Sequence, residues 1–450
     1  MTTFEFYSDR LAYSPEAQAI VALSQGSPEI FDTRLEPLMI AGRRIAPWGA
    51  DNDLPNRILD KVRQNDIVSP NLLFNVQTGY GQGIVPMMRY RDDSGVHYEP
   101  CFDREVNEFF EDNDVNGFFL EQLSDMMTFF NVFPEIILSR DGKKITGLRH
   151  LEAMYSRWGS LSKQENEISR HYYAEWDAGV PKDGTIGETK VLSRYHTLDH
   201  LRRLMASRCK DRRFVLQVSM PTPGRTYYSY PYWWSIFKSG WFDLASMLPA
   251  FKKSLLKNHL AVRYIVYIAD EYWRELSAQE HINPDDKEKF ESVKRREVGK
   301  IMEFLTNEDG KGGGFVSTVK NMPSGGSKPY ECKYIQIETI KPAIEGGEFI
   351  EDAEEASNII SYAMGVHPNL NGATPGKSKG SLGGSDKREL FNIKQAMMRP
   401  FRDRLLKPLT LIKRYNGWPE DLVFTVPEHF FTTLDQDKTG SKMTVQNPKS

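Results

Sequence analysis

The sequence predicts an α+β protein, and three features of the chain support this fold class. The first half combines strand-like runs with amphipathic helical runs. A smaller α+β unit follows at 261–349, between two helical runs. The third feature is the stretch from Ile350 to Trp418, which predicts a helix, a flexible basic loop and a long helix. It is the most informative part of the 450 residues.

The composition limits what the protein can be. Hydrophobic residues make up 40% of the chain and charged residues 26%, with a net charge of −3. Any contact with nucleic acid must therefore come from local basic patches, because the chain has no overall positive charge. The length fits two or three compact units, or one elongated subunit with several lobes.

The cysteines and the N-terminus predict a soluble protein made in a reducing cytoplasm. Cys101, Cys209 and Cys332 lie far apart, a spacing that excludes a disulfide framework and a cysteine-based zinc motif. Residues 1–10 carry acids and aromatics where a signal peptide would be basic and then apolar. No apolar stretch reaches the length of a membrane span, so we expect no membrane association.

The first 230 residues predict an arm followed by an α+β lobe. Residues 1–53 show little periodicity, so an extended arm is expected. Residues 54–76 and 103–130 have helical spacing of apolar side chains. The turn Arg140-Asp141-Gly142-Lys143 between two apolar runs indicates a hairpin over 133–148. Further strands are expected at 171–176 and 214–218.

A basic segment at 199–213 follows, and we interpret it first as a solvated surface. Its cations are Arg202, Arg203, Arg208, Lys210, Arg212 and Arg213. A specific contact with nucleic acid is the alternative. His196 and His200 stand four residues apart, a spacing that can hold a metal, but a surface pair is the favoured interpretation.

An aromatic cluster at 227–234 leads into a predicted helix at 233–260. One face of this helix carries an apolar stripe, which we expect to lie in the core or at a subunit interface: Trp233, Phe237, Trp241 and Leu244. Near the end of the helix stand three lysines, whose charges are favourable beside its C-terminal dipole: Lys252, Lys253 and Lys257.

The unit at 261–349 is predicted to hold strands at 261–268, 315–319 and 333–340. Asn283-Pro284-Asp285-Asp286 is a helix start signal, since proline and acids favour the first turn. We expect that helix to end near Phe304.

The loop after Met364 contains six glycines between Gly365 and Gly384, with Lys377 and Lys379 among them. The run from Gly372 to Ser378 superficially resembles a phosphate-binding loop. However, only three residues separate its glycines, and Pro375 removes a backbone N–H from the cradle. We therefore expect no nucleotide, and no other cofactor or metal is predicted.

A long basic helix is predicted from Asp386 to Tyr415, kinked at Pro400 and Pro408. Apolar residues recur along it at spacings of three and four, and this periodicity predicts its buried face: Leu390, Ile393, Met397, Phe401, Leu405, Leu409 and Ile412. Its lysines and arginines, Lys394 and Arg402 among them, are assigned to the opposite face.

The order of these parts resembles that of the portal proteins of tailed bacteriophages, over roughly residues 55–418. The sharpest local likeness is Gly365-Val366-His367-Pro368-Asn369-Leu370-Asn371-Gly372, which is similar to the Gly-Val-Pro turn that many portals place after the second stem helix. This chain differs by inserting His367 before Pro368.

The resemblance implies a portal-like subunit divided into lobes, and it assigns the segments as follows: 1–53 N-terminal arm, 54–230 wing, 231–260 first stem helix, 261–349 clip, 350–365 second stem helix, 366–385 tunnel loop, 386–418 long wing helix, and 419–450 a reduced or absent crown or disordered tail.

The resemblance also implies a function that needs no catalytic residue. Portals form rings, usually of twelve copies, at one capsid vertex, where double-stranded DNA enters and leaves. The implied partners are the terminase large subunit, major capsid or scaffolding protein, and head–tail adaptor proteins. The implied location is the virion, after assembly in the host cytoplasm. Lys377 and Lys379 are then expected to touch the DNA backbone without reading its sequence. Lys252, Lys253 and Lys257 are candidates for lining the channel.

Two other functions compete with this one. A soluble hydrolase would need a cluster of catalytic residues, and the sequence has no HExxH or GxSxG pattern. A small-oligomer DNA-binding protein could instead use the arginines of segment 202–213.

Overall fold

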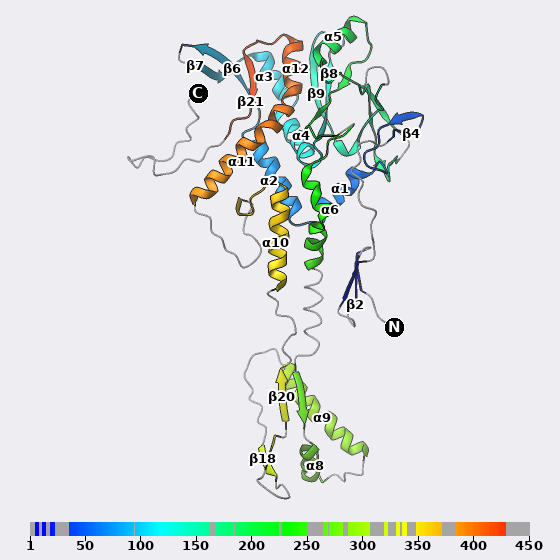
Figure 1. Cartoon of the computed structure of the whole chain (residues 1–450), viewed down its shortest axis with the longest axis vertical. Coiled ribbons are helices and arrows are strands. Elements are labelled where there is room, and N and C mark those ends of the chain that lie inside the picture. Colours follow the sequence, from blue (N-terminus) through cyan, green and yellow to red (C-terminus); the bar gives the residue numbers. More distant parts are fainter. Residues whose placement is uncertain are drawn as a thin grey trace, which may run out of the picture. The chain divides into compact units, whose positions relative to one another are not determined.

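A computed structural model describes most of the chain. The described residues are 5–8, 11–14, 19–22, 36–93, 95–162, 167–182, 185–224, 227–249, 264–268, 270–281, 287–306, 319–322, 330–333, 335–339, 348–370 and 384–428. The chain divides into two compact units (Figure 1), one formed by 1–249 with 347–450 and the other by 250–346.

A seven-stranded sheet forms one part of the first unit. Along it lie β10 (Ser156–Trp158), β11 (Arg170–Tyr173), β14 (Gly187–Val191), β15 (Arg213–Val215) and β8 (Asn131–Leu138). One edge of β8 pairs with β15 and with β16 (Val218–Ser219), and the other edge pairs with β9 (Ile145–Leu151). The predicted hairpin at 133–148 and the strands near 171 and 214 are confirmed.

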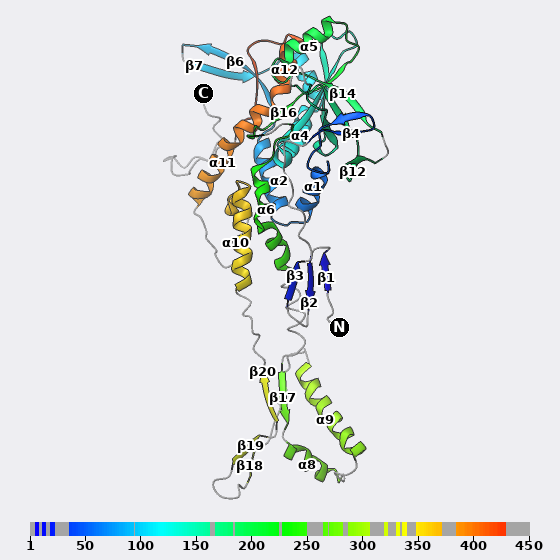
Figure 2. The same ribbon diagram turned by 45° about the vertical axis from the view of Figure 1, so that its right-hand side comes forward.

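Helices pack beside this sheet. They are α1 (Leu54–Arg63), α2 (Val68–Tyr80), α3 (Arg104–Asp112) and α4 (Val115–Phe129), and α2 packs on α4 in both ribbon views (Figures 1 and 2). The single helix predicted at 103–130 is wrong. Asp114 adopts a left-handed φ of 42°, breaks the run, and accepts a hydrogen bond from the Gly117 amide at 3.1 Å.

Smaller elements complete the first unit. They are β1 (Glu5–Ser8), β2 (Leu11–Ser14), β3 (Ala19–Ala22), β4 (Leu38–Ile40), β5 (Arg43–Ile45), β6 (Val85–Asp92), β7 (Gly95–Pro100), η1 (Ala153–Tyr155), β12 (Trp176–Asp177), β13 (Val180–Pro181), α5 (Thr197–Ala206) and β21 (Leu422–Thr425). β21 pairs with β6, so residues 422–425 of the segment assigned to a reduced crown or disordered tail belong to the sheet, and residues 429–450 lie outside the described residues. Leu422 is fully buried, which accounts for this ordering.

The centre of the core is aromatic. Trp48 stacks on Tyr228 with ring centroids 4.2 Å apart, and its ring edge meets Phe129 at 5.6 Å. The Tyr228 hydroxyl donates to the Ala46 carbonyl, so this buried polar group is satisfied. The extended arm expected at 1–53 is therefore wrong for its last residues, because Ile45 to Trp48 belong to the core.

The helix predicted at 233–260 is interrupted. A 3₁₀ turn, η2 (Tyr232–Ser235), leads into α6 (Ile236–Ser239), and Gly240 then takes a φ of 84° before the helical residues 241–249. Glycine adopts this left-handed conformation without the steric cost that other residues bear. The remainder of the predicted helix lies outside the described residues.

The described residues of the second unit form two antiparallel strand pairs and two helices. They are β17 (Tyr264–Ile268), α8 (Asp270–Gln279), α9 (Lys287–Thr306), β18 (Val319–Met322), β19 (Tyr330–Lys333) and β20 (Ile335–Thr339). β17 pairs with β20 and β18 with β19, both antiparallel. The helix start predicted near Asn283 is confirmed by α9. α8 was not predicted. Of the strand expected at 315–319, only Val319 lies within the described residues, where it begins β18.

The C-terminal part of the first unit contains α10 (Glu348–Ala363), η3 (Pro368–Leu370), α11 (Gly384–Leu405) and α12 (Lys407–Asn416). The predicted interruption of the long basic helix is confirmed: Pro400 lies inside α11, and α12 starts as a separate helix with Pro408 in its first turn. Within the part of the chain that the structure describes, no helix is long and apolar enough to cross a membrane.

Two buried polar side chains lie inside the sheet layer. Arg157 is fully buried between Trp48 and Trp176 and donates to the Asn52 side chain at 2.7 Å. His171 is fully buried against Phe133. Neither of its ring nitrogens has a hydrogen-bond partner among the described residues. Burial, reinforced by the Arg157 charge, lowers the pKa of His171 to about 3.

This buried histidine predicts acid sensitivity. Because the folded-state pKa is below the ordinary value, the unfolded chain binds the proton more readily. The free energy of unfolding is therefore highest above about pH 6.5. It falls by about 1.4 kcal/mol per pH unit as the pH drops towards 3. His171→Phe should remove this slope, measured as the free energy of unfolding between pH 7 and pH 4.5. Exposed His196→Gln is the control, and parallel slopes in wild type and His171→Phe would refute the assignment.

Candidate functional site

The lysines predicted to face a channel fall outside the described residues. Lys377 and Lys379 lie in segment 371–383, and Lys252, Lys253 and Lys257 lie in segment 250–263. Their proposed roles stay predictions. The structure does describe the two helices that flank the loop, and it shows how each is held.

The buried face of α11 differs from the one that its periodicity predicted. Ile393 and Met397, assigned to the core, are each 57% exposed. Lys394, Gln395, Met398 and Arg402 are buried instead, and Lys394 and Met398 each stand one position further along the helix. Leu405, Leu409 and Ile412 are buried as predicted. One residue rotates a helix face by about 100°, so the helix buries two of the cations that we had assigned to solvent.

Lys394 explains part of this rotation, because it closes the carboxyl end of α10. Its ammonium donates to the Gly365 carbonyl oxygen at 2.8 Å. Gly365 has a φ of 66°, and the amides of Gly365 and Val366 bond back to the carbonyls of Tyr362 and Ser361, each at 2.9 Å. This is a Schellman turn, in which the favoured residue is glycine. Burial lowers the pKa of Lys394 to about 8.

Two asparagines of α2 hold the same end of α10. The Asn75 side chain donates to the Met364 carbonyl at 3.1 Å, and the Asn71 side chain donates to the Ser361 hydroxyl at 3.0 Å. Both asparagines are buried. Their four-residue spacing places them on one face of α2, so α2 and α11 together fix the residue from which the loop departs.

Arg402 lies two turns after Lys394 on α11 and binds the carboxyl end of a second helix, α2. Its guanidinium donates to the carbonyls of Thr78 and Gly79, both at 2.9 Å, in the last turn of α2. It also pairs with Glu428 at 2.5 Å. The negative end of the α2 dipole and the carboxylate both favour this buried cation. We call Lys394, Arg402, Asn71 and Asn75 the polar clasp.

The sequence contained a signal for the clasp that apolar periodicity does not detect. Lys394, Met398 and Arg402 repeat every four residues, and Asn71 and Asn75 share that spacing within an otherwise apolar run. Polar residues at a four-residue spacing form a buried face only where another element supplies carbonyl groups as acceptors. Which element does so is seen only in the folded structure.

The aromatic stripe, expected in the core or at a subunit interface, lies in the core at its first residue. Trp233 is 6% exposed and lies in the core of its own chain, where its indole N–H donates to the Met127 carbonyl at 3.1 Å. Phe237 packs edge-on against Trp233 and Phe242. Trp241 and Leu244 are half-buried, and their interface role stays a prediction.

The histidine pair has a structural explanation. His200 Nδ1 accepts a hydrogen bond from the Ser193 amide at 2.8 Å, while His196 is exposed at the start of α5. Within the described ranges, no group of three His, Cys, Asp or Glu side chains could hold a metal ion.

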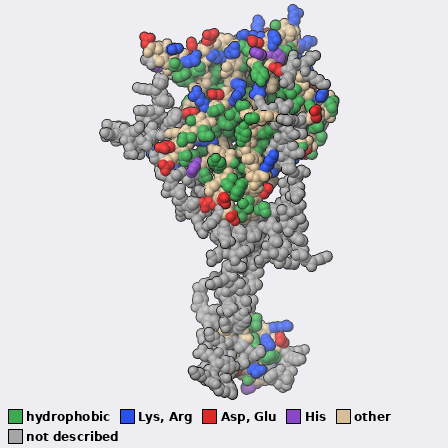
Figure 3. Space-filling model, in the orientation of Figure 1, with side chains coloured by type: hydrophobic (Ala, Val, Ile, Leu, Met, Phe, Trp, Pro, Cys, Tyr) green, Lys and Arg blue, Asp and Glu red, His purple; other side chains and the backbone are tan. Residues whose placement is uncertain are grey.

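Figure 3 shows Lys and Arg side chains near α5, where Arg202 and Arg203 are exposed.

Arg402→Met should destabilise the first unit by about 2–4 kcal/mol, because the Thr78 and Gly79 carbonyls and Glu428 lose their buried partner. The measurement is the free energy of unfolding in denaturant. Arg399→Met is the matched control, since Arg399 is exposed on the same helix, and it should change stability by less than about 0.5 kcal/mol. Equal effects in the two variants would contradict the clasp.

Lys394→Met should loosen the end of α10 locally. We expect the amides of Gly365 and Val366 to exchange with solvent about tenfold faster or more, because one buried carbonyl loses its donor. Hydrogen–deuterium exchange of the intact protein measures this change. Lys387→Met, at an exposed position of α11, is the control. Unchanged protection in Lys394→Met would mean that the Schellman turn holds this end by itself.

Comparison with known proteins yields structures but no sequence relatives. No family model matches the chain, and no curated protein matches it. A chain in the neck of an empty gene transfer agent (GTA) particle, computed with C6 symmetry, matches with a TM-score of 0.50 and 13% identity, over 85% of each chain.

Two further matches have slightly lower scores. A chain in the virion of a native GTA particle has a TM-score of 0.49 and 13% identity over 82% of each chain. A chain in the neck of a native GTA particle, computed with C12 symmetry, has a TM-score of 0.49 and 14% identity, over 82% of this chain and 83% of that one. The protein therefore has the fold of a gene transfer agent neck chain, in agreement with the connector-like fold that its sequence resembles.

Proposed function

We propose that this chain is the subunit of a portal-type ring at one capsid vertex, through which double-stranded DNA is packaged and ejected. The observation that carries the proposal is the fold shared with a GTA neck chain over 85% of both chains. That neck was computed with C6 symmetry, so its chains are arranged around an axis. A chain of the same fold is suited to the same kind of arrangement.

A closed ring would arise from head-to-tail contacts repeated around one axis. Each subunit then presents one surface to the next and a different surface to the previous one. Trp241 and Leu244, half-buried in the isolated chain, are candidates for such contacts. About twelve copies are expected, by analogy with portal rings.

Within the ring, the loop after α10 would touch DNA. Lys377 and Lys379 supply two positive charges in a glycine-rich segment. Affinity for DNA rises steeply with the number of neutralised phosphates, so many tight contacts would stop a moving duplex. A few lysines per subunit, repeated around an axis, give weak and interchangeable contacts that carry no sequence information.

The polar clasp supports this role because it fixes the helices on either side of the lysine-bearing segment. Lys394, Asn71 and Asn75 hold the end of α10, and Arg402 holds α11 against α2. Force on the loop would then be transmitted into the packed body of the subunit. The clasp residues would then affect DNA movement without contacting the DNA.

The remaining assignments follow the same analogy. The lobes would be a wing, a two-helix stem, a clip at about 261–349 and a reduced crown. The terminase motor, capsid or scaffolding protein, and head–tail adaptors would dock on the ring. The chain would act without catalysis or a cofactor, in the virion and during assembly in the host cytoplasm.

The main rival is a monomeric or dimeric DNA-binding protein that uses the exposed arginines of α5, among them Arg202 and Arg203. The mass of the particle in solution distinguishes a ring from a monomer or dimer. Native mass spectrometry of the purified protein should give a particle of about twelve subunits. A protein that stays monomeric or dimeric across salt and concentration would refute the ring.

A charge reversal tests the loop. Lys377→Glu with Lys379→Glu should leave ring mass unchanged but reduce the amount of DNA packaged or retained, because phosphates are then repelled. Lys387→Glu, an exposed lysine of α11, is the control for a general effect of charge. Normal DNA content in the double variant would exclude the loop as the contact.

A further inference from the structure

The long helix α11 carries an apolar strip on its outer surface. The strip consists of four exposed side chains: Ile393, Ala396, Met397 and Pro400. Ile393 and Met397 are the large members, and each is 57% exposed. Because each residue turns a helix by about 100°, these four positions share about a third of its circumference. We call them the outer stripe.

The polar clasp explains why the outer stripe faces away from the core. Lys394 and Arg402 point inwards, where they donate to the carbonyls of Gly365 and Gly79. The outer stripe lies roughly half a turn around the helix axis from these two cations. A helix face that meets only water usually carries polar side chains, among which exposed apolar residues are scattered singly. A contiguous apolar strip on this face indicates that another surface covers it.

Two carboxylates border the outer stripe. Glu389 lies about one turn before Ile393, and Asp403 lies about one turn after Pro400. Both side chains are exposed, and neither forms an ion pair with a described residue. The surface that covers the stripe should therefore combine apolar side chains with positive charge.

The β4–β5 hairpin presents a face of this kind. Its inner face is anchored in the first unit, because Ile45 is fully buried and Ile40 packs against the same small cluster, which includes Trp176. Met39 and Arg44 pair across the two strands, and side chains alternate along a strand, so both point to the other face. Met39 is 65% exposed, and Arg44 is exposed as well.

Arg44 leaves a positive charge on this outer face of the hairpin. The neighbouring Arg43 lies 3.6 Å from Glu188 and is paired with it. Arg44 forms no ion pair with a described residue, so its charge is available to a second molecule. The face therefore offers a large apolar side chain and a cation, which complement the apolar and acidic surface of α11.

The two surfaces lie on opposite sides of the first unit. The ribbon views show α11 on one side and β4 on the other, before and after the rotation (Figures 1 and 2). A subunit of a closed ring uses two different surfaces, because it meets one neighbour with each side. The outer stripe and the hairpin are placed where two such surfaces are required.

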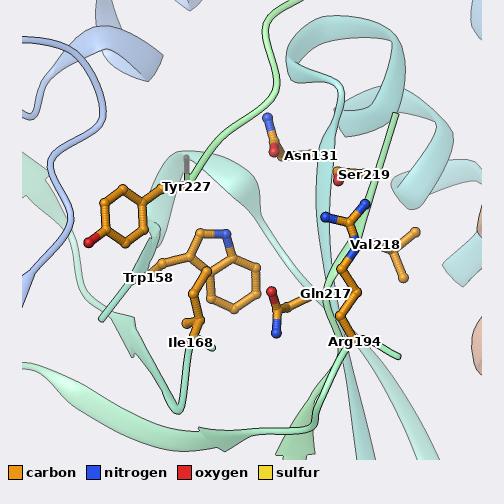
Figure 4. A pocket seen from close by; sticks show the side chains of 8 residues that line it. All are labelled: Asn131, Trp158, Ile168, Arg194, Gln217, Val218, Ser219 and Tyr227. Carbon is orange, nitrogen blue, oxygen red and sulfur yellow. The ribbon is translucent and has the colours of Figure 1, made fainter. Parts of the chain in front are cut away.

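The pocket shown in Figure 4 belongs to a different part of the first unit. It is lined by residues of the seven-stranded sheet and its connections, among them Trp158, Arg194 and Gln217. Its lining includes no residue of the outer stripe or of the hairpin. Both surfaces are open faces and not walls of that pocket, so a macromolecule is the fitting partner.

We propose that the outer stripe of one copy packs against the β4–β5 hairpin of the next copy. Met39 would lie against Met397, and Arg44 would pair with Glu389 or Asp403 at the margin of the contact. Charges at such a margin fix the orientation of two partners, while the apolar centre excludes water. The inference rests on the proposed ring and names one contact that would close it.

Site-directed cross-linking tests the contact in the full chain. A parent with Cys209→Ser and Cys332→Ser retains only the buried Cys101. Met39→Cys and Met397→Cys are added to this parent together and singly, and a short bismaleimide then joins thiols that lie close together. The two sites lie on opposite sides of one chain, so we expect the double variant to give a ladder of linked chains on denaturing gels.

The matched control combines Met39→Cys with Arg399→Cys, because Arg399 is exposed on another face of α11. It should give no ladder above that of the parent. Linked dimers from Met397→Cys alone would place two outer stripes against each other and overturn the proposal. It would also be overturned by the absence of a ladder in the double variant, or by equal ladders in the double variant and the control.

A charge exchange tests the margin of the contact. Arg44→Glu should raise the protein concentration at which half of the subunits are assembled by about tenfold or more, because the new carboxylate faces acids of the neighbour. Glu389→Lys or Asp403→Lys in the same chain should restore assembly, which a general loss of stability would not allow. Sedimentation velocity across a concentration series measures this. An Arg44→Glu variant that assembles normally, or that neither lysine restores, would contradict the contact.

These results separate the contact from the ring itself. A wild type that forms rings, with no ladder in the double cysteine variant and no effect of Arg44→Glu, leaves the proposed function intact and refutes this contact. A wild type that stays monomeric refutes both. Met39 and Met397 are exposed, so the cysteine variants keep the test valid if a charged variant fails to fold.

Discussion

The body of the first unit depends on one helix, α11, whose buried side chains close the carboxyl ends of two others. Lys394 reaches the Gly365 carbonyl after α10, and Arg402 reaches the last carbonyls of α2. A helix end buried without partners would leave several carbonyl groups unsatisfied, at a cost of about 1–3 kcal/mol each. The same principle recurs at α4, where the Trp233 and Trp234 indoles donate to the Met127 and Thr128 carbonyls.

The sequence predicted the fold class and most local elements, because those follow from short-range spacing. The 133–148 hairpin, the helix after Asn283 and the interruption at Pro408 depend only on neighbouring residues. The failures have different causes. Asp114 broke a predicted helix because its side chain accepts a hydrogen bond from the Gly117 amide and so starts a new helix there. Ile393 and Met397 were assigned to the core because apolar periodicity takes no account of helix ends that need a cation.

The candidate site was predicted less completely than the fold. The position of the loop between two helices, and its glycine and lysine content, could be predicted from composition. The clasp could not, because Asn71 and Lys394 are more than 300 positions apart along the chain and meet only through packing. Trp233 likewise has the spacing of an interface stripe, yet its indole N–H finds a partner inside its own subunit. Spacing identifies a face but does not say what covers it.

The polar clasp holds the end of α10, and holds α11 against α2, on either side of the predicted lysine-bearing loop. Its side chains are buried and hydrogen-bonded, so in the proposed ring this frame would keep its geometry as DNA passes. The central claim is that identical subunits arrange this loop around an axis. Electron cryomicroscopy of the purified protein tests it most directly. The account predicts a closed ring with segment 371–383 of every subunit facing the central opening. A closed ring with that segment on its outer surface, or no ring, would contradict it.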